Sequence, residues 1–575
     1  MKRTGAQSIW ASLEKMGVTT VFGYPGGAIL PTYDALTEFP SIRHILVRHE
    51  QGATHMADGY ARAGGGVGVA IATSGPGATN MVTGMATAMM DSTPMVCITG
   101  QVGAALIGTE AFQETDITGV TLPITKHNYL VTKAEDIAPT LREAFHVART
   151  GRPGPVHVDI TKDAQQNSCT FEWDDTEIQL PGLKPSKALA PESVRKALEL
   201  LAAAERPLIL AGHGILLSGA TQVMRAFAEK GDIPVAMTLL GISAVPAQHP
   251  LNLGMMGMHG EAWVNQAIQD ADLLIACGMR FDDRVTGNLK NYAPNAKKIH
   301  IDIDPTEFNK NVRVDVALAG DLREILEQLL PHLGERRHAD WHAKIAANRG
   351  HAAVRDITNL PDDGHLYAAH VIHDLWKATG GNAIVATDVG QHQMWEAQYY
   401  KHNEPRTLLT SGGLGTMGFA LPAAIGAKLA RPDADVWAVA GDGGFQMTMP
   451  ELGTMAQEHI KVNVAIINNG YLGMVRQWQQ FFYEKRYTAT PILSPDYAKV
   501  AEAYGLKGQT VRQRSEVIPA AQAARAHGKA VIIDFQVEQE DSVYPMVPTG
   551  AALHEMITRG TTMPSNPIVE TSASV

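Results

Sequence analysis

Short runs of β-branched and aliphatic residues recur along the whole chain, and each is followed by a glycine-rich turn and a helix-like pattern. Examples are GVGVAIATSGPG, RPLILAGHG, DVWAVAGDGG and VNVAIINNG. Apolar strands that alternate with helices are typical of parallel sheets covered on both faces. The pattern therefore predicts an α/β protein built from doubly wound parallel sheets over a chain of 575 residues.

Two polar, aperiodic stretches interrupt this alternation. The stretch around residues 168–192 is rich in proline and charge, and the stretch around residues 333–365 ends in NLPDDGHL. Both compositions are typical of connectors between domains. We therefore expect three domains of the doubly wound kind, at 1–167, 192–333 and 366–548. The tail at 549–575 has little packing potential, so we expect a frayed end, although a tail of this kind could close over a site.

Composition and charge exclude several classes of protein. The formal net charge is −11 and the basic residues are dispersed, which argues against a nucleic-acid partner. Cys97, Cys169 and Cys277 are far apart and form no CxxC pair, so neither a disulfide framework nor a structural zinc site is expected. The first residues do not resemble a signal peptide, and no apolar run approaches the roughly 20 residues of a membrane helix. These features predict a cytoplasmic protein without a membrane partner.

The strongest local signal lies at the ends of two predicted strands in the last domain. The sequence GDGG, which contains Asp442, follows VWAVA, and a pair of asparagines that includes Asn469 ends VNVAII. In a parallel sheet both turns fall at the carboxyl edge, where α/β folds bind ligands. The Asp442 carboxylate, the Asn469 amide oxygen and a backbone carbonyl near Tyr471 offer three oxygens, and two diphosphate oxygens and a water would complete the octahedron of Mg²⁺. Gly443 and Gly444 let the backbone approach the diphosphate.

An ordinary strand and turn with incidental polar residues would explain GDG alone. GDG paired with NN resembles the motif of the thiamine-diphosphate-dependent decarboxylases and carboligases. In that superfamily a glutamate of the first domain hydrogen-bonds the aminopyrimidine ring and promotes proton transfer from the thiazolium carbon. Glu50, in the sequence RHEQGA, has the matching place between a strand and a helix-like segment. The alternative for Glu50 is a helix N-terminal acid that balances the helix dipole.

Essentially the whole chain resembles one family of this superfamily, the catalytic large subunits of acetohydroxyacid synthases, also called acetolactate synthases. The matching stretches include VFGYPGGAILPTYDAL, TSGPGATN, AFQETD, TDVGQHQMW, RFDDRVTGN and GMVRQWQQ, and the last two together are specific to the family. The resemblance implies a transferase that decarboxylates pyruvate on thiamine diphosphate with Mg²⁺. It then joins the hydroxyethyl unit to a second pyruvate or to 2-ketobutyrate, in branched-chain amino-acid biosynthesis.

The resemblance also has implications for assembly. It implies like folds for the first and last domains, and a homodimer or tetramer with active sites at the dimer interface. Glu50 of one chain would reach the cofactor held by the other. A separate small regulatory subunit is a further partner in this family.

The same resemblance assigns residues to the cofactors. Met417 has the place of the bulky residue that holds thiamine diphosphate bent, although core filler is the commoner use of Met. The other implied contacts of this cofactor are Gln391, His392, Gly415, Gly443, Gly444 and Met474. The middle domain resembles a domain that binds FAD, which this family requires structurally without net redox chemistry. The implied flavin contacts are Arg152, Gly212, Gly214, Thr238, Leu239, His259, Arg280, Asp282, Arg284, Asp302 and Asp321.

One residue departs from the family pattern in the flavin domain. His213 stands in Gly212-His213-Gly214, where the family has three glycines. A histidine at this position would alter the local contact with the flavin, but it does not exclude FAD binding.

A further set of residues resembles the catalytic and substrate-channel residues of the family. Each has a structural alternative: Lys162 and Arg284 as solvated charges, Phe112 and Trp478 as core aromatics. The implied set is Phe112, Gln113, Lys162, Met258, Arg284 and Trp478, together with Glu50.

Three other functions stay open at this point. A sister carboligase, such as one for glyoxylate, would be expected to lack Glu50. A pyruvate oxidase would use the FAD for redox and consume oxygen or a quinone. A non-catalytic binding or regulatory subunit would be expected to lose Glu50, Asp442 or Asn469, all of which are present.

Overall fold

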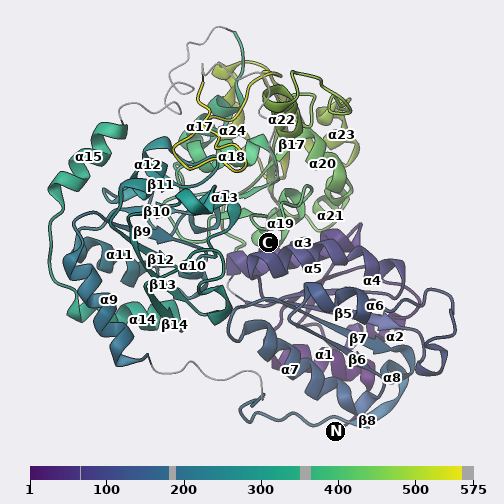
Figure 1. Ribbon diagram of the computed structural model, residues 1–575. Coiled ribbons are helices and arrows are strands. Elements are labelled where there is room, and N and C mark those ends of the chain that lie inside the picture. Colours follow the sequence, from purple (N-terminus) through teal and green to yellow (C-terminus); the bar gives the residue numbers. More distant parts are fainter. Residues whose placement is uncertain (65, 181–188, 350–363, 560–575) are drawn as a thin grey trace.

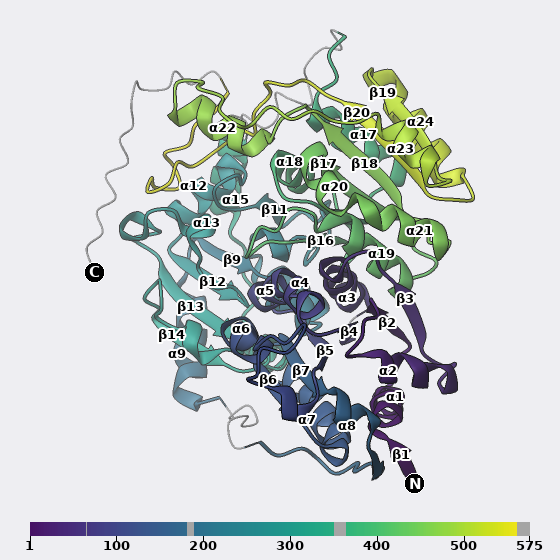
Figure 2. The same cartoon turned by 90° about the vertical axis from the view of Figure 1, so that its right-hand side faces the viewer.

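The computed structural model describes residues 1–64, 66–180, 189–349 and 364–559. Three six-stranded sheets dominate it, and the strands of each are parallel (Figure 1). Each sheet lies inside one of the three predicted domains and is flanked by helices, and Figure 2 shows the three units packed around one another. The expectation of doubly wound α/β domains is confirmed.

The first sheet has the strand order β3-β2-β4-β5-β7-β6. Its strands are β2 (Thr20–Gly23), β3 (Arg43–Leu46), β4 (Gly68–Ala72), β5 (Met95–Gln101), β6 (His127–Val131) and β7 (Pro155–Thr161). The helices around it are α1 (Gly5–Lys15), α2 (Leu30–Ala35), α3 (Glu50–Gly64), α4 (Pro76–Asn80), α5 (Val82–Asp91), α6 (Ile117–Thr121), α7 (Ile137–Arg149) and α8 (Lys162–Gln166).

The third sheet repeats this order as β16-β15-β17-β18-β20-β19. Its strands are β15 (Ile384–Thr387), β16 (Leu408–Thr410), β17 (Val436–Gly441), β18 (Asn463–Asn468), β19 (Lys507–Val511) and β20 (Val531–Gln536). Its helices are α17 (Ala368–Thr379), α18 (Gln391–Tyr399), α19 (Ala420–Ala430), α20 (Asp442–Thr448), α21 (Leu452–Gln457), α22 (Gly473–Phe482), α23 (Tyr497–Ala503) and α24 (Arg514–Ala526). The expected likeness of the two outer domains is confirmed at the level of strand order.

The middle sheet has a different order, β11-β10-β9-β12-β13-β14, which is that of dinucleotide-binding folds. Its strands are β9 (Pro207–Ala211), β10 (Val235–Met237), β11 (Asn252–Met255), β12 (Leu273–Cys277), β13 (Lys297–Asp302) and β14 (Val316–Ala319). Its helices are α9 (Pro191–Ala203), α10 (Gly214–Leu217), α11 (Thr221–Gly231), α12 (Ala262–Asp270), α13 (Asp283–Thr286), α14 (Leu322–Leu329) and α15 (Ala339–Arg349). The order reverses between β9 and β12, so the crevice at their carboxyl ends is the expected ligand site of this domain.

The central strands are apolar because both of their faces are covered. Every residue of β4, β9, β12 and β17 is buried. Burial of this kind contributes roughly 25 cal/mol per Å² of apolar surface. The fully apolar runs that predicted parallel sheets therefore lie in the buried hydrophobic clusters of the three domains.

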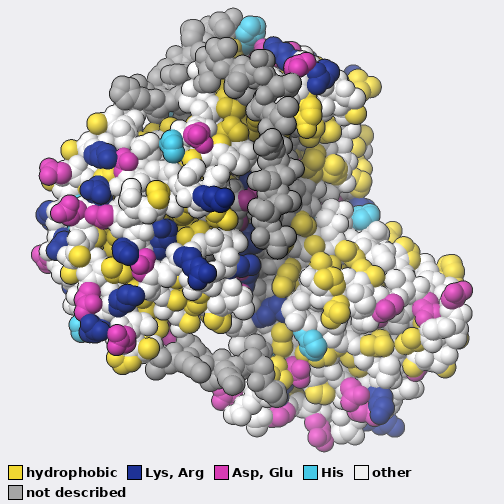
Figure 3. All heavy atoms as spheres, viewed as in Figure 1, with side chains coloured by type: hydrophobic (Ala, Val, Ile, Leu, Met, Phe, Trp, Pro, Cys, Tyr) yellow, Lys and Arg dark blue, Asp and Glu magenta, His cyan; other side chains and the backbone are white. Residues whose placement is uncertain are grey.

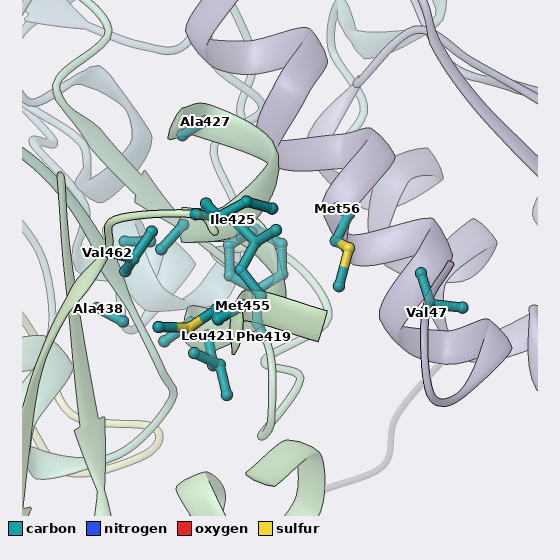
Figure 4. Close-up of a cluster of buried hydrophobic side chains, with 14 of the residues drawn as sticks. Val47, Met56, Phe419, Leu421, Ile425, Ala427, Ala438, Met455 and Val462 are labelled. Carbon is teal, nitrogen blue, oxygen red and sulfur yellow. The ribbon is translucent and has the colours of Figure 1, made fainter. Parts of the chain in front are cut away.

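Helices α3 and α19 join the first and third domains. Gly59 of α3 lies against the carbonyl of Ala423, and Gly426 of α19 lies against the carbonyl of Met56, so a Cβ at either glycine would collide with backbone. Figure 4 shows Met56 facing side chains of the third domain such as Ile425, and these belong to one buried cluster. The two outer domains of one chain thus share a continuous core.

The connectors and the tail pack more than their composition indicated. Residues 168–170 form β8 (Ser168–Thr170), which pairs with β1 (Lys2–Thr4), and the predicted helical stretch of the second connector is α15, whose Trp341 is buried on the middle domain. In the tail, Leu553 and Ile557 are buried, and the Ala551 carbonyl accepts a hydrogen bond from Asn288 N. The expectation of little packing is therefore wrong for residues 549–559, because apolar side chains in AALHEMI cover the middle domain. The rest of the predicted tail, 560–575, lies outside the described residues.

Candidate functional site

A small pocket of about 60 Å³ opens at the carboxyl edge of the third sheet. It lies between the turns that follow β15, β17 and β18, since the adjacent pairing of β17 with β18 brings GDG and NN together. The sequence-predicted residues that line it are Gln391, His392, Met417, Asp442, Gly443, Gly444, Asn469, Tyr471 and Met474.

Asp442 and Asn469 are both buried in this pocket, and their side-chain oxygens accept hydrogen bonds from neighbouring groups. Asp442 Oδ2 accepts hydrogen bonds from Gly470 N (3.0 Å) and Ser494 Oγ (2.9 Å). Asn469 Oδ1 accepts from Tyr471 N (3.1 Å). Burial raises the pKa of Asp442 to about 6, against which its hydrogen bonds act. A carboxylate that is costly to bury without a counter-charge is well suited to a divalent cation.

Within the described parts of the chain, no three His, Cys, Asp or Glu side chains gather into a cluster that would hold a metal by themselves. The pocket offers one carboxylate, the amide oxygens of Asn469 and Gln391, and backbone carbonyls, and Gln391 Oε1 already accepts from Asn469 Nδ2 (3.2 Å). These are too few ligands for a closed protein site. This donor set fits a Mg²⁺ ion that completes its shell with diphosphate oxygens and water.

His392 supplies a polar atom that has no hydrogen-bond partner among the residues that the structure describes. Its Nε2 is buried and makes no hydrogen bond, and burial lowers its pKa to about 3. The ring lies against Gly390 and Gly441, where a Cβ would approach to within 2.9 and 2.8 Å. A neutral imidazole nitrogen in the pocket wall fits a hydrogen bond to a bound group.

Asp388 lies behind the pocket and joins two of its loops. Its Oδ1 accepts from Val389 N (2.9 Å) and Gly418 N (2.7 Å). Burial raises its pKa to about 7. A Cβ at residue 444 would collide with this carboxylate. Packing against Asp388 therefore requires a glycine at this position, in addition to any requirement of a ligand in the pocket.

A larger cavity of about 780 Å³ adjoins the pocket. Its volume lies in the range of about 300–1,000 Å³ that is usual for sites of small molecules and cofactors. Val389, Gly390, Met417, Met474 and Val475 line both spaces, so the two are continuous. The sequence-predicted residues in its wall are Arg152, His213, Gly214, Thr238, Leu239, Met258, His259, Arg280, Asp282, Arg284, Asp302, Asp321, Gly415, Met417, Met474 and Trp478.

The cavity lies at the reversal of strand order in the middle sheet. Gly214 packs against Gly278, which follows β12, and a Cβ at Gly214 would lie 2.7 Å from Gly278 Cα. Gly212, also predicted as a flavin contact, does not line the cavity; a Cβ there would collide with the Gly278 carbonyl. The glycines of this turn therefore allow the ends of β9 and β12 to approach each other.

The polar wall of the cavity mixes both signs of charge. Arg152 donates to Ser92 Oγ (2.8 Å) and to Glu307 Oε1 (3.0 Å), which links the first and middle domains. Burial raises the pKa of Asp302 to about 6. Asp321 caps α14 by accepting from Arg323 N (2.9 Å), so its carboxylate already has a structural use.

Trp478 of α22 is a further residue of the cavity wall. Its ring packs on Phe482, with the centroids 5.1 Å apart, beside Met546 and Ile557 of the C-terminal segment. Arg284, which also lines the cavity, is exposed and pairs with Asp283 (3.4 Å). The geometry thus places Trp478 in a cavity wall and not in a closed core.

The predicted residues of the first domain lie elsewhere. Glu50, Phe112, Gln113 and Lys162 line neither the pocket nor the cavity. They follow strands of the first sheet, at its carboxyl edge, and Phe112 is 88% exposed.

Glu50 is the first residue of α3, as the helix-dipole alternative requires, but its side chain has another partner. Its Oε2 accepts from Asn80 Nδ2 (2.9 Å), and the carboxyl group is buried. Glu451, which follows α20, accepts from Arg48 N and His49 N, so Glu50 lies near the opposite end of α20 from Asp442. A helix of seven residues spans about 10 Å. One chain therefore holds the halves of the predicted active site apart.

Several residues of the site were missed from the sequence. Asp388 directly follows β15, as Asp442 directly follows β17, so the same signal was available for it. Ser92, Glu307 and Val475 line the cavity through tertiary packing and carry no local signal.

Three family descriptions cover the chain, in the order of its three sheets. They are the N-terminal TPP binding domain, the central domain and the C-terminal TPP binding domain of thiamine pyrophosphate enzymes, at residues 3–120, 194–329 and 388–535. Together with the pocket that holds Asp442 and Asn469, they define a thiamine-diphosphate-dependent enzyme.

Relatives narrow the class further. The chain is 50% identical over 566 residues to an acetolactate synthase of Mycobacterium bovis, covering 96% of this chain and 91% of that protein. It is 48% identical over 561 residues to the acetolactate synthase large subunit of Corynebacterium glutamicum (96% and 89%). A probable acetolactate synthase large subunit of Methanocaldococcus jannaschii is 45% identical over 562 residues (96% and 95%). The chain belongs to the acetolactate synthase large-subunit family.

The surface agrees with the sequence prediction on charge. Figure 3 shows Lys, Arg, Asp and Glu side chains intermixed over one face, without a basic stripe. None of the helices in the described ranges is long and apolar enough to cross a bilayer.

Proposed function

We propose that this enzyme makes 2-acetolactate from two molecules of pyruvate, or 2-aceto-2-hydroxybutyrate from pyruvate and 2-ketobutyrate, as a cytoplasmic protein. The observation that carries the proposal is the pocket at the carboxyl edge of the third sheet, which contains Asp442, Asn469 and His392. The Nε2 of His392 has no partner among the described residues, and the pocket is continuous with a cavity that Trp478 lines. Family membership supports the same activity.

Asp442, Asn469 and the backbone at Tyr471 would hold Mg²⁺, and His392 and Gln391 would contact the diphosphate. Thiamine diphosphate, when bound, supplies the nucleophilic carbon and the electron sink for decarboxylation. Met417, in the wall between pocket and cavity, would orient the two rings. The apolar side chains of Met474, Val475 and Trp478 would exclude water while the acceptor ketoacid binds.

The larger cavity would hold FAD. Its place at the strand reversal of a dinucleotide-binding order supports this, as does a wall with arginines for phosphates and carboxylates for hydroxyl groups. Asp302 and Arg152 would contact the flavin nucleotide, whereas Asp321 would act through the end of α14.

A second copy of the chain would complete the active site. Glu50, Gln113 and Lys162 follow strands of a sheet that has the same order as the sheet of the proposed Mg²⁺ site, yet they lie outside that site's pocket. In a two-fold dimer each first domain would face the partner's third domain, and Glu50 would hold and transfer the proton of the aminopyrimidine. A separate regulatory subunit is a further partner.

The product identifies the reaction. Purified protein supplied with pyruvate, thiamine diphosphate, Mg²⁺ and FAD should release acetolactate and CO₂ without consuming oxygen. Acetate formed with uptake of oxygen would instead indicate a pyruvate oxidase.

Mixing two inactive variants tests the shared site. Glu50→Gln and Asp442→Ala, dissociated and reassociated in equal amounts, should recover about a quarter of wild-type activity, because half of the dimers are mixed and each has one intact site of two. A site contained within one chain predicts no recovery. Each variant reassociated with itself is the control.

A further inference from the structure

A buried charge cluster joins the domains beside the larger cavity. Arg62, near the C-terminal end of α3, pairs with Asp58 one turn earlier and with Asp91 at the end of α5, where the Nη2–Oδ2 distance is 2.9 Å. The side chains of both aspartates are fully buried. Arg62 Nη1 also donates to the carbonyl of Thr410 (2.8 Å), the last residue of β16 in the third domain. The cluster therefore crosses the boundary between the first and third domains.

Asp91 extends the cluster to the loop after β16. Its Oδ2 accepts from Gly412 N (3.0 Å) and its Oδ1 from Gly413 N (2.7 Å). Its carbonyl accepts from His213 Nδ1 (3.0 Å) of the middle domain. One aspartate thus contacts all three domains.

The loop that Asp91 holds belongs to both ligand spaces. Gly412 and Gly413 line the larger cavity, as do Asp91 and His213. The same loop continues through Gly415 to Met417, which lines the pocket as well. Two consecutive amides bound to one carboxylate fix the orientation of the backbone, because charge-assisted hydrogen bonds are short and directional.

Gly413 is adapted to this contact. A Cβ at residue 413 would lie 2.9 Å from Asp91 Oδ1 and 2.9 Å from Met90 Cβ. A glycine is therefore needed there for the carboxylate to approach the backbone.

We propose that Asp91 is a positioning residue, which holds the loop 411–417 in the conformation that binds the flavin and places Met417, with Arg62 fixing the carboxylate. Asp91 acts through two backbone amides and takes no part in the chemistry. The inference rests on the proposed flavin in the larger cavity.

The decisive comparison is between Asp91→Asn and Asp58→Asn. Both variants remove one negative charge from Arg62 in the same buried cluster, so both destabilise the fold. Only Asp91→Asn disturbs the loop. Each oxygen of Asp91 accepts from one backbone N–H, so in either orientation the NH₂ group of an asparagine faces Gly412 N or Gly413 N, and two donors then oppose each other. Asp58→Asn therefore controls for the loss of the ion pair.

The readouts are flavin affinity, from quenching of flavin fluorescence, and hydrogen exchange of the peptide that spans 408–419 in flavin-free protein. We expect Asp91→Asn to weaken FAD binding by about tenfold to a hundredfold, the usual range for a lost charge-assisted hydrogen bond. It should also speed exchange at Gly412 and Gly413. Asp58→Asn should leave both close to wild type, although the two variants lower the melting temperature alike.

Equal flavin affinity and equal exchange in the two variants would overturn the inference. Failure of the wild-type protein to bind FAD would instead contradict the proposed function, and the exchange measurement would still decide the role of Asp91. If Asp91→Asn does not fold, Arg62→Lys takes its place, since lysine cannot bridge Asp91 and the Thr410 carbonyl at once. If hydrogen exchange of the peptide 408–419 in Arg62→Lys is the same as in Asp58→Asn, the inference is also overturned.

Discussion

Replacement of Glu50 by Gln tests the proton-transfer role most directly. The amide keeps the shape of the side chain and can still accept from Asn80 Nδ2, so the hydrogen bond of 2.9 Å and the start of α3 should survive. What is lost is the exchangeable proton. Groups of this kind contribute about 10²–10⁴-fold to rate, so we expect turnover to fall by that factor.

The magnitude depends on the surroundings of Glu50. The residue is only 8% exposed, and Gly77 leaves room for its Oε1, where a Cβ would lie 3.2 Å away. Water has little access to replace the carboxyl group as a proton carrier. The expected loss of turnover is therefore nearer to 10⁴ than to 10², about 5 kcal/mol of transition-state stabilisation.

Three measurements on Glu50→Gln test this role: the rate of acetolactate formation, the melting temperature, and the affinity for thiamine diphosphate by calorimetry. Asn80→Ala is the matched control, because it removes the hydrogen bond that Glu50→Gln keeps but leaves the carboxyl group. It should cost far less activity. Turnover of Glu50→Gln within a few-fold of wild type would refute the reasoning. So would a loss that tracks a fall in melting temperature, which would return Glu50 to the role of a helix N-terminal acid.

Three other outcomes are expected. Asp442→Ala should abolish Mg²⁺-dependent binding of thiamine diphosphate. In the wild type, calorimetry should show weaker binding as the pH falls through about 6, because burial raises the pKa of Asp442 to that value and the protonated acid is no ligand. Unchanged affinity in either experiment would count against the metal site. FAD should bind, yet turnover should persist when the flavin is reduced or replaced by an inert analogue; a rate that depends on its redox state would favour an oxidase. Trp478→Leu should lower the preference for 2-ketobutyrate over pyruvate, since one methylene in an apolar wall is worth ~1–3 kcal/mol. The ratio of the two products, with both acceptors in one vessel, measures this preference. Joint loss of both products with a lower melting temperature would mark Trp478 as a packing residue.

Sequence patterns predicted the local parts of this structure well. The pairing of Asp442 with Asn469 followed from strand order, because consecutive strands β17 and β18 are neighbours. The continuous apolar runs indicated parallel sheets because both faces of such strands are buried.

The sequence patterns could not predict the tertiary contacts. The same alternation of strands and helices yields one strand order in the outer domains and another in the middle domain, and only the assembled sheet shows where each order reverses. The contacts of Asp91 with Gly412 and His213 join segments far apart in sequence, so no local signal marks them. The packing of Leu553 was missed for the same reason.

The crossing of α3 and α19 determines which parts of the molecule can act as a hinge. At Gly59 and Gly426 the two helices meet backbone to backbone, with no side chains between them that could change rotamer to absorb a shift. The first and third domains of a chain should therefore move as one body, and the edges of their two sheets keep a fixed spacing. The middle domain enters and leaves this body through one connector at each end. The middle domain supplies much of the wall of the 780 Å³ cavity, so its displacement is the domain motion that would change the width of that cavity.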